Sequence, residues 1–82
     1  MDDDELLKRI STNPKVMVGK PVIRGTRLPV EYLLNRLAHG DAIETILEEY
    51  DGLQREDIYA CILYASKNLE NSTIYSLVEK PI

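Results

Sequence analysis

The sequence has few of the residues that make covalent or metal cross-links. It holds a single cysteine, Cys61, so no disulfide can form within the chain. Cys61 and the single histidine, His39, cannot assemble a structural zinc site by themselves, because such a site takes four ligands. Cys61 lies in an apolar run, which favours a buried thiol over a reactive one.

Long hydrophobic runs and a basic N-terminus are also missing. The longest apolar stretch, residues 58–65, is far shorter than the ~18 residues that span a bilayer. The chain starts Met-Asp-Asp-Asp-Glu, the opposite of the basic start of a signal peptide. With 44% hydrophobic and 29% charged residues, the composition is that of an ordinary globular domain. We expect a single cytoplasmic domain over residues 1–82.

Features of an enzyme are scarce. His39 has no second histidine and no obvious nucleophile to complete a catalytic site. Clustered carboxylates could hold a divalent metal, but their helical spacing is that of a solvated helix face: Glu44, Glu48, Glu49 and Asp51. The sequence therefore predicts no enzyme, no metal site and no cofactor.

Acidic residues are absent between Leu6 and Val30. Six basic residues occupy that stretch: Lys8, Arg9, Lys15, Lys20, Arg24 and Arg27. The segments on either side are acidic and bring the net charge of the chain to −4. Such a one-sided distribution indicates a polyanion such as DNA as a partner of the basic segment, because lysine and arginine release counterions from phosphates. The alternative is a solvated positive face that only offsets the acidic helices.

The first third reads as short extended pieces separated by turn residues. Residues 9–11 and 22–23 favour strands, while Asn13-Pro14, Gly19 and Gly25 favour turns. This pattern predicts a hairpin-like β/turn segment over residues 6–29.

A first helix is predicted from residue 30. Its apolar residues are spaced for one helix face: Val30, Leu33, Leu34, Leu37 and Ala38. Pro29 suits the first helical position, because its missing N–H would have no partner there. Gly40 suits the left-handed residue that closes the helix.

A second helix is predicted to start at Asp41, with Glu44 completing a capping box. Gly52 is expected in the turn that ends it. The buried face of this helix is expected to hold Ile43, Ile46, Leu47 and Tyr50.

A third helix is predicted from about Gln54 to Glu70, and it is apolar on nearly every side. A core of 82 residues is too small to cover such a helix, so we expect a homodimer. The residues expected at the subunit interface are Tyr59, Leu63 and Tyr64. Three helices, with a turn of about three residues before the last, outline a helix-turn-helix module. Glu56 and Asp57 at the start of the last helix disfavour base reading there, because carboxylates repel phosphates.

The stretch from residue 19 to residue 30 reads Gly-Lys-Pro-Val-Ile-Arg-Gly-Thr-Arg-Leu-Pro-Val. Together with Gly40, the run from Ile46 to Tyr50 and the run from Glu56 to Ile58, it resembles the signature of the domain of unknown function 433 family of small bacterial proteins. The resemblance covers about residues 9–65 and implies a mainly α, homeodomain-like helical fold. It also implies an antitoxin paired with a PIN-like ribonuclease toxin. Gln54 stands where that family usually has serine or threonine, which weakens the helix cap.

Several residues of this stretch are expected to shape the backbone. Gly19 and Gly25 suit tight turns, and Thr26 can bond a nearby backbone group. Gly19-Lys20 is not a Walker motif, because proline stands where the first glycine belongs. Arg24 and Arg27 have two readings: they contact phosphates, or they serve the fold by pairing with helix acids such as Glu31 or with helix C-terminal carbonyls.

The combined prediction is a cytoplasmic antitoxin-type protein that neutralises a PIN-like toxin and represses its operon as a dimer or complex. The predicted DNA contacts are Arg9, Lys20, Arg24 and Arg27. The tail, residues 71–82, follows the three-helix module of residues 30–70 and is the predicted toxin-binding surface. Its predicted contacts are Ile74, Tyr75, Leu77 and Val78. The rival hypothesis is a protein interaction or assembly module that binds no nucleic acid.

Overall fold

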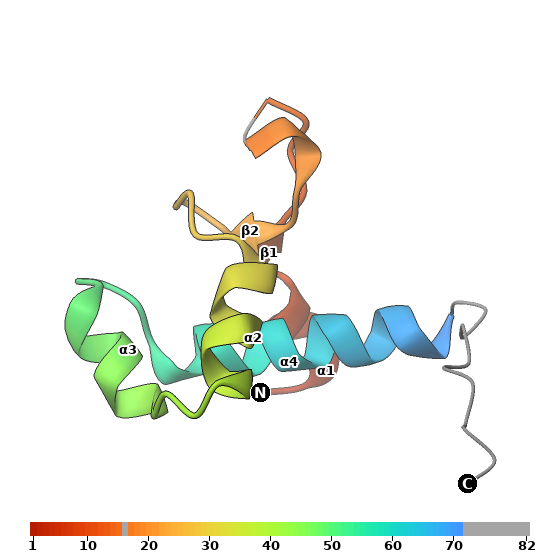
Figure 1. The fold of residues 1–82 in the computed structure, drawn as a ribbon. Coiled ribbons are helices and arrows are strands. Elements are labelled where there is room, and N and C mark those ends of the chain that lie inside the picture. The colour runs from red at the N-terminus through yellow and green to blue at the C-terminus, as the bar shows by residue number, and fades with distance from the viewer. Residues whose placement is uncertain (16, 72–82) are drawn as a thin grey trace, which may run out of the picture.

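The computed structural model describes residues 1–15 and 17–71 of the chain. Over these residues the fold is mainly helical, with four α-helices and one two-stranded sheet, which confirms the predicted α-rich class (Figure 1). In chain order the elements are α1 (Asp3–Leu7), β1 (Ile10–Ser11), the 3-10 turn η1 (Met17–Gly19), β2 (Val22–Ile23), α2 (Val30–Ala38), α3 (Ile43–Glu49) and α4 (Arg55–Glu70). None of these helices is long and apolar enough to cross a membrane.

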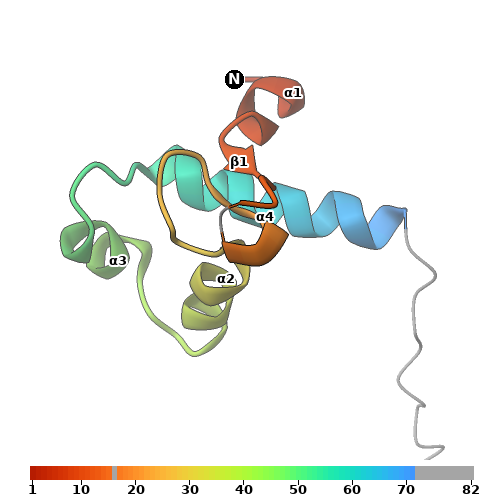
Figure 2. The ribbon, with the colours of Figure 1, turned by 90° about the horizontal axis from the view of Figure 1, so that it is seen from above.

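The longest helix, α4, is the scaffold on which the other elements pack. It contacts α1, α2, α3 and β1, and the two ribbon views show α2 crossing it on one side and α1 lying on another (Figures 1 and 2). Leu33 of α2, Ile46 of α3 and Ile58 of α4 are fully buried where these helices meet. Cys61 is buried in the same core, as expected from its apolar neighbours.

The basic segment contains the predicted hairpin-like structure. β1 and β2 pair antiparallel, with Ile10 opposite Ile23 and Ser11 opposite Val22. Gly19 and Gly25 both adopt positive φ, as their place in tight turns requires. The predicted boundary at residue 6 is wrong, because Leu6 and Leu7 belong to α1.

Helix α1 was not expected from the sequence. The Asp2 carboxylate accepts from the amide of Glu5 at 2.8 Å, and the amide of Asp2 donates to the Glu5 carboxylate at 3.3 Å. This capping box stabilises the start of α1. The carboxylates of the acidic first turn stabilise it further, because they lie at the positive end of the helix dipole. The acidic start of the chain is therefore a capped helix whose Leu6 packs against the core.

Helix α2 covers the predicted residues, but its start differs from the prediction. Pro29 is the N-cap, with extended backbone, and Val30 is the first helical residue. The amide of Val30 donates to the carbonyl of Pro21 at 2.9 Å, so β2 and the start of α2 are held together. Gly40 closes the helix with positive φ, as predicted.

The predicted Asp41 cap of α3 is wrong. The N-cap is Ala42, and no side chain caps this helix. The Asp41 carboxylate accepts instead from Nε of Arg36 at 2.6 Å. Asp41 does not cap α3 because its carboxylate pairs with Arg36 of α2.

Helix α4 starts where predicted, after the N-cap Gln54. The Asp57 carboxylate accepts from the amide of Gln54 at 2.9 Å, which supplies a partner at the helix start. Gly52 takes positive φ in the turn before α4. Residues 50–54 separate α3 from α4, so this turn is longer than the expected three residues.

Candidate interaction surfaces

Arg24 serves the fold. Its Nε donates to the carbonyl of Lys8 at 2.7 Å, and its Nη2 donates to the carbonyl of Ile10 at 3.0 Å. Lys8 is the C-cap of α1, so the guanidinium binds a helix C-terminal carbonyl, as the structural reading of this arginine expected. Arg24 therefore ties the loop after β2 to the end of α1 and to β1.

Two other predicted DNA contacts are also paired within the chain. Arg9 forms an ion pair with Asp57 at 3.0 Å and a hydrogen bond with the Gln54 amide oxygen at 3.0 Å. Asp57 is only 7% exposed, so this pair joins β1 to the start of α4 inside the fold. Lys20 pairs with Glu31 at 3.1 Å on the surface. Such an exposed pair costs little to open and leaves Lys20 accessible to another anion.

Arg27 differs from these three residues. Within residues 1–15 and 17–71 it makes no hydrogen bond and no ion pair, and its side chain is exposed. The preceding turn is fixed by Thr26, whose hydroxyl donates to the carbonyl of Ile23 at 2.7 Å and accepts from the amide of Leu28 at 3.0 Å. This confirms the expected backbone bond of Thr26. The turn therefore presents an unpaired guanidinium on a fixed backbone.

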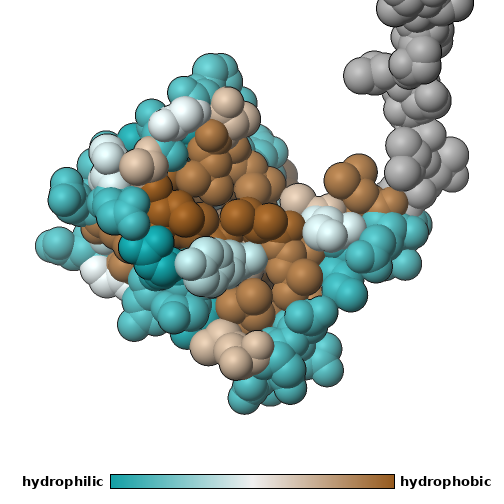
Figure 3. Space-filling model, turned by 90° about the horizontal axis from the view of Figure 1, so that it is seen from below, coloured by the Kyte–Doolittle hydropathy of each residue, from teal (hydrophilic) through white to brown (hydrophobic). Residues whose placement is uncertain are grey.

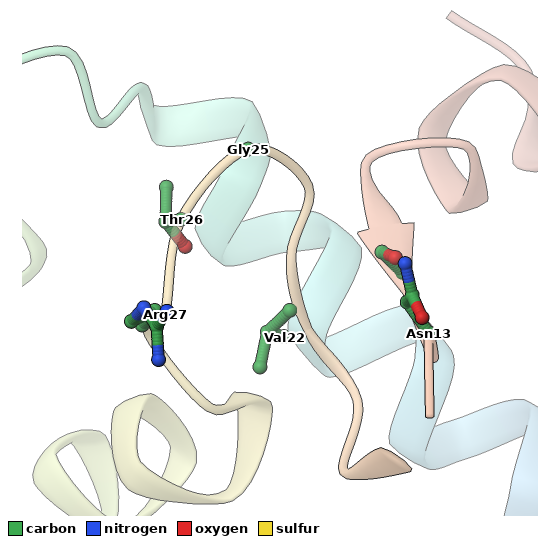
Figure 4. A pocket seen from close by; sticks show the side chains of 6 residues that line it. Asn13, Val22, Gly25, Thr26 and Arg27 are labelled. Carbon is green, nitrogen blue, oxygen red and sulfur yellow. The ribbon is translucent and has the colours of Figure 1, made fainter. Parts of the chain in front are cut away.

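A cavity of about 600 Å³ opens beside Arg27. Figure 4 shows Arg27 and Asn13 on opposite sides of it with Val22 between them. Its lining residues come from β1 and the residues that follow it, and from β2 and the turn after it: Ser11, Asn13, Val22, Gly25, Thr26 and Arg27. We call this space the signature cavity. No carboxylate is among these lining residues.

A second hollow, the apolar groove, lies between α2 and the C-terminal half of α4. Glu31 and Asn68 are the polar residues in its lining. The other lining residues are mainly apolar: Pro21, Val30, Leu34, Tyr64, Ala65 and Leu69. An adjoining hollow shares Ala65 and Leu69 and extends to Ile62. Figure 3 shows apolar side chains gathered along α4 on the face seen from below. Ile62 is 46% exposed and Leu69 is 59% exposed, so this surface is open among the described residues.

The residues predicted at a subunit interface lie on α4. Tyr59 is 43% exposed, whereas Leu63 and Tyr64 are half-buried and Tyr64 packs against the core. The predicted toxin contacts Ile74, Tyr75, Leu77 and Val78 lie outside the described residues.

Two charged side chains at the start of α4, Arg55 and Asp57, are engaged with neighbours in the chain. Arg55 pairs with Glu44 of α3 at 2.7 Å, and this contact lowers the pKa of the Glu44 carboxyl. Asp57 is held by Arg9 and by the Gln54 amide. The guanidinium of Arg55 and the carboxylate of Asp57 are therefore both held by contacts within the chain.

The described residues contain no group of three or more metal-ligating side chains. The carboxylate of Glu49 instead accepts from both Nη1 and Nη2 of Arg36, the latter at 2.9 Å. These contacts with Arg36 lower the pKa of the Glu49 carboxyl. His39 caps α2 with Nδ1 2.8 Å from the carbonyl of Asn35.

Comparison with known proteins supplies the family. A family model described as "Protein of unknown function (DUF433)" matches residues 10–65, from β1 well into α4. The chain belongs to the DUF433 family. A crystal structure of a DUF433 member protein from Anabaena variabilis is 34% identical in sequence, with a TM-score of 0.72 over 82% of this chain and 66% of that one.

Two relatives are described as uncharacterized proteins. Protein y4eO of Sinorhizobium fredii is 36% identical over 59 residues, which are 72% of this chain and 27% of that protein. A protein of Archaeoglobus fulgidus is 60% identical over 25 residues, which are 30% of this chain and 69% of that protein. This DUF433 chain thus spans only about a quarter of the length of the Sinorhizobium relative.

The DUF433 match covers the two hollows unequally. Every residue that lines the signature cavity lies within residues 10–65. The apolar groove reaches past the end of the match, because Asn68 and Leu69 complete it. The cavity is therefore built wholly from the family segment, whereas the groove also depends on the last turns of α4.

Proposed function

We propose that this DUF433 protein is an antitoxin-type component that binds and neutralises a PIN-like ribonuclease toxin, and that the apolar groove is part of its toxin-binding surface. The observation that carries the proposal is the exposure of the groove between two well-packed helices. Leu69 is 59% exposed beside Leu34 and Tyr64, in a hollow whose lining is almost wholly apolar.

Covering such a surface releases free energy. Burial of apolar area contributes about 25 cal/mol per Å² removed from water. An amphipathic segment laid between α2 and α4 would bury this area with little change in the groove, because the groove walls are helices anchored in the core. The groove therefore supports a protein partner more directly than a small polar substrate.

The class of partner comes from the resemblance to the family. That resemblance implies a PIN-like ribonuclease, and we propose that the partner of this protein is such an enzyme. The tail with Ile74, Tyr75, Leu77 and Val78 follows α4 in the sequence, and we keep these residues in the proposal as further toxin contacts.

Repression of its own operon is the second part of the proposal. In this proposal α3 and α4 form a homeodomain-like helix-turn-helix. The protein acts as a dimer, with subunit contacts made by Tyr59 and neighbouring side chains of α4. DNA contact would come from the basic segment, because Arg55 and Asp57 at the start of α4 are already paired.

The alternative function is a protein interaction or assembly module that binds no nucleic acid. One specific observation favours it: Arg9, Lys20 and Arg24 all contact groups of their own chain. Absence of any salt-dependent binding to promoter DNA would select this alternative.

The proposed toxin contact can be tested by co-purification with the product of the adjacent open reading frame. Wild-type protein should retain a PIN-like nuclease, whereas Leu69→Asp should lose it, because a carboxylate in the groove loses its water on binding. Val18→Asp is the matched control, since Val18 is 94% exposed and lies outside the groove. Equal retention by both variants would contradict a role for the groove, and an adjacent product without nuclease activity would contradict the antitoxin assignment.

A further inference from the structure

The turn that carries Arg27 is held from several sides. Besides the two bonds of Thr26, the amide of Ile23 donates to the carbonyl of Leu28 at 3.0 Å. The amide of Arg24 donates to the carbonyl of Arg9 at 2.7 Å, so the base of the turn is fixed to the residue before β1. Arg27 thus projects from a backbone that is already ordered, which lowers the entropy cost of using it in binding.

The side chains around the signature cavity supply hydrogen-bond donors. Arg27 offers a guanidinium, and Ser11 offers a hydroxyl. The Asn13 side-chain oxygen accepts from the amide of Lys15 at 2.8 Å, which leaves the amide nitrogen of that side chain as a donor. A donor-rich cavity without a carboxylate matches an oxyanion, and guanidinium binds phosphate through two parallel bonds.

We propose that the signature cavity is a phosphate-binding site that holds a phosphodiester of a nucleic-acid backbone between Arg27 and the Ser11–Asn13 wall. This inference rests on the DNA-binding part of the proposed function and assigns that part to one place. No aromatic ring is among the described residues that line the cavity, so the proposed contact reads the backbone and is independent of sequence. A volume of about 600 Å³ leaves room for the sugars on either side of the phosphate.

The position of the cavity suits a polyanion. In Figure 1 the loop after β1 and the turn after β2 rise above α4, whereas the acid-rich α1 and α3 lie at its level or below. Lys15 and Lys20 belong to the same raised loop, and Lys20 pairs there with Glu31 at 3.1 Å in an exposed contact. Nucleic acid can therefore approach this side without meeting the acidic helices first.

A titration at several salt concentrations tests the site, with a labelled promoter duplex as the probe and amide chemical shifts as the readout. Wild-type protein should show shifts at Asn13, Gly25 and Arg27. Arg27→Gln should weaken binding about tenfold, as the loss of one charged hydrogen bond to phosphate predicts. The same variant should lower the salt slope by about 0.9, the value for one phosphate contact. Lys67→Gln removes the same charge from α4, where Lys67 pairs with Asp3 at 3.6 Å, and should change little.

Two further probes separate the sources of an oxyanion. Inorganic phosphate should shift the same amides weakly, and polyglutamate at equal ionic strength should not. Stronger shifts with polyglutamate than with DNA would overturn the proposal in favour of an acidic protein ligand. Unchanged duplex binding by folded Arg27→Gln would also overturn it, as would no binding by wild-type protein. Retention of the nuclease in the same preparations would show that toxin binding stands even if this site fails.

Discussion

At the scale of single residues, two arginines three positions apart have different roles. Arg24 donates to the carbonyls of Lys8 and Ile10, while Arg27 faces an open cavity. The sequence alone could not separate these roles, because a guanidinium in a rigid turn serves a backbone carbonyl and a phosphate equally well. The difference depends on where α1 ends, and α1 was not expected from the sequence.

Arg24→Ala should therefore destabilise the fold, and Arg27→Ala should not. Loss of two charge-assisted hydrogen bonds at a largely exposed side chain should lower the free energy of unfolding by about 1–2 kcal/mol. Urea denaturation followed by circular dichroism would measure both variants. Equal stability of Arg24→Ala and Arg27→Ala would contradict the structural role of Arg24.

Burial in the core sets the reactivity of the only thiol. Burial raises the pKa of Cys61 to about 12, so the reactive thiolate is rare at pH 8. Native protein at pH 8 should react with a thiol reagent at least tenfold more slowly than protein in denaturant, because the thiol is both buried and protonated. Absorbance of the released reagent measures the rate, and rapid stoichiometric reaction of the native protein would contradict the buried position.

At the scale of helices and strands, periodicity predicted α2 and α4 well. The errors are the missed helix α1 and the caps of α2 and α3. The apolar spacing of α2 is local information, so the position of this helix could be read from the sequence, with only the role of Pro29 differing. The cap of α3 could not, because Asp41 bonds Arg36 of the preceding helix. The sequence predicted a turn-rich segment over residues 6–29. It could not predict the signature cavity, because the pairing of β1 with β2 brings Asn13 opposite Arg27.

The contact between α2 and α3 predicts a dependence of stability on pH. Arg36 holds the pKa of the Glu49 carboxyl below its ordinary value of 4.5. A group with a lowered folded-state pKa stabilises the fold above the unfolded-state value, and this contribution is lost as pH falls through the folded-state pKa. The melting temperature should therefore fall as the pH drops below about 4.5.

Glu49→Gln should flatten that acid dependence and lower the melting temperature at pH 7. Glu48→Gln is the control, because this substitution removes the same charge and Glu48 makes no ion pair among the described residues. Thermal melts of the three proteins from pH 3 to pH 7 would show the effect. Identical pH profiles for both variants would argue against the Arg36 contact.

At the scale of the whole molecule, α4 packs its buried face against every other helix and leaves Tyr59, Ile62 and Leu69 exposed. The sequence predicted this excess of apolar surface on α4, and it remains the basis of the expected homodimer. Light scattering at micromolar concentration should give twice the chain mass, and Tyr59→Glu should shift it toward the monomer, while Val18→Asp should leave it unchanged. A monomeric mass for wild-type protein would refute the dimer.

The central claim is that the apolar groove binds and silences a ribonuclease. The most direct measurement is the cleavage rate of a labelled RNA by the product of the adjacent open reading frame, which we propose to be the nuclease, titrated with wild-type protein or with Leu69→Asp. Wild-type protein should abolish cleavage near one equivalent. At nuclease concentrations below the Kd, the variant, shown to be folded by circular dichroism, should raise the half-inhibitory concentration at least tenfold, as loss of about 1.4 kcal/mol of binding free energy predicts. Equal inhibition by both proteins would contradict the claim.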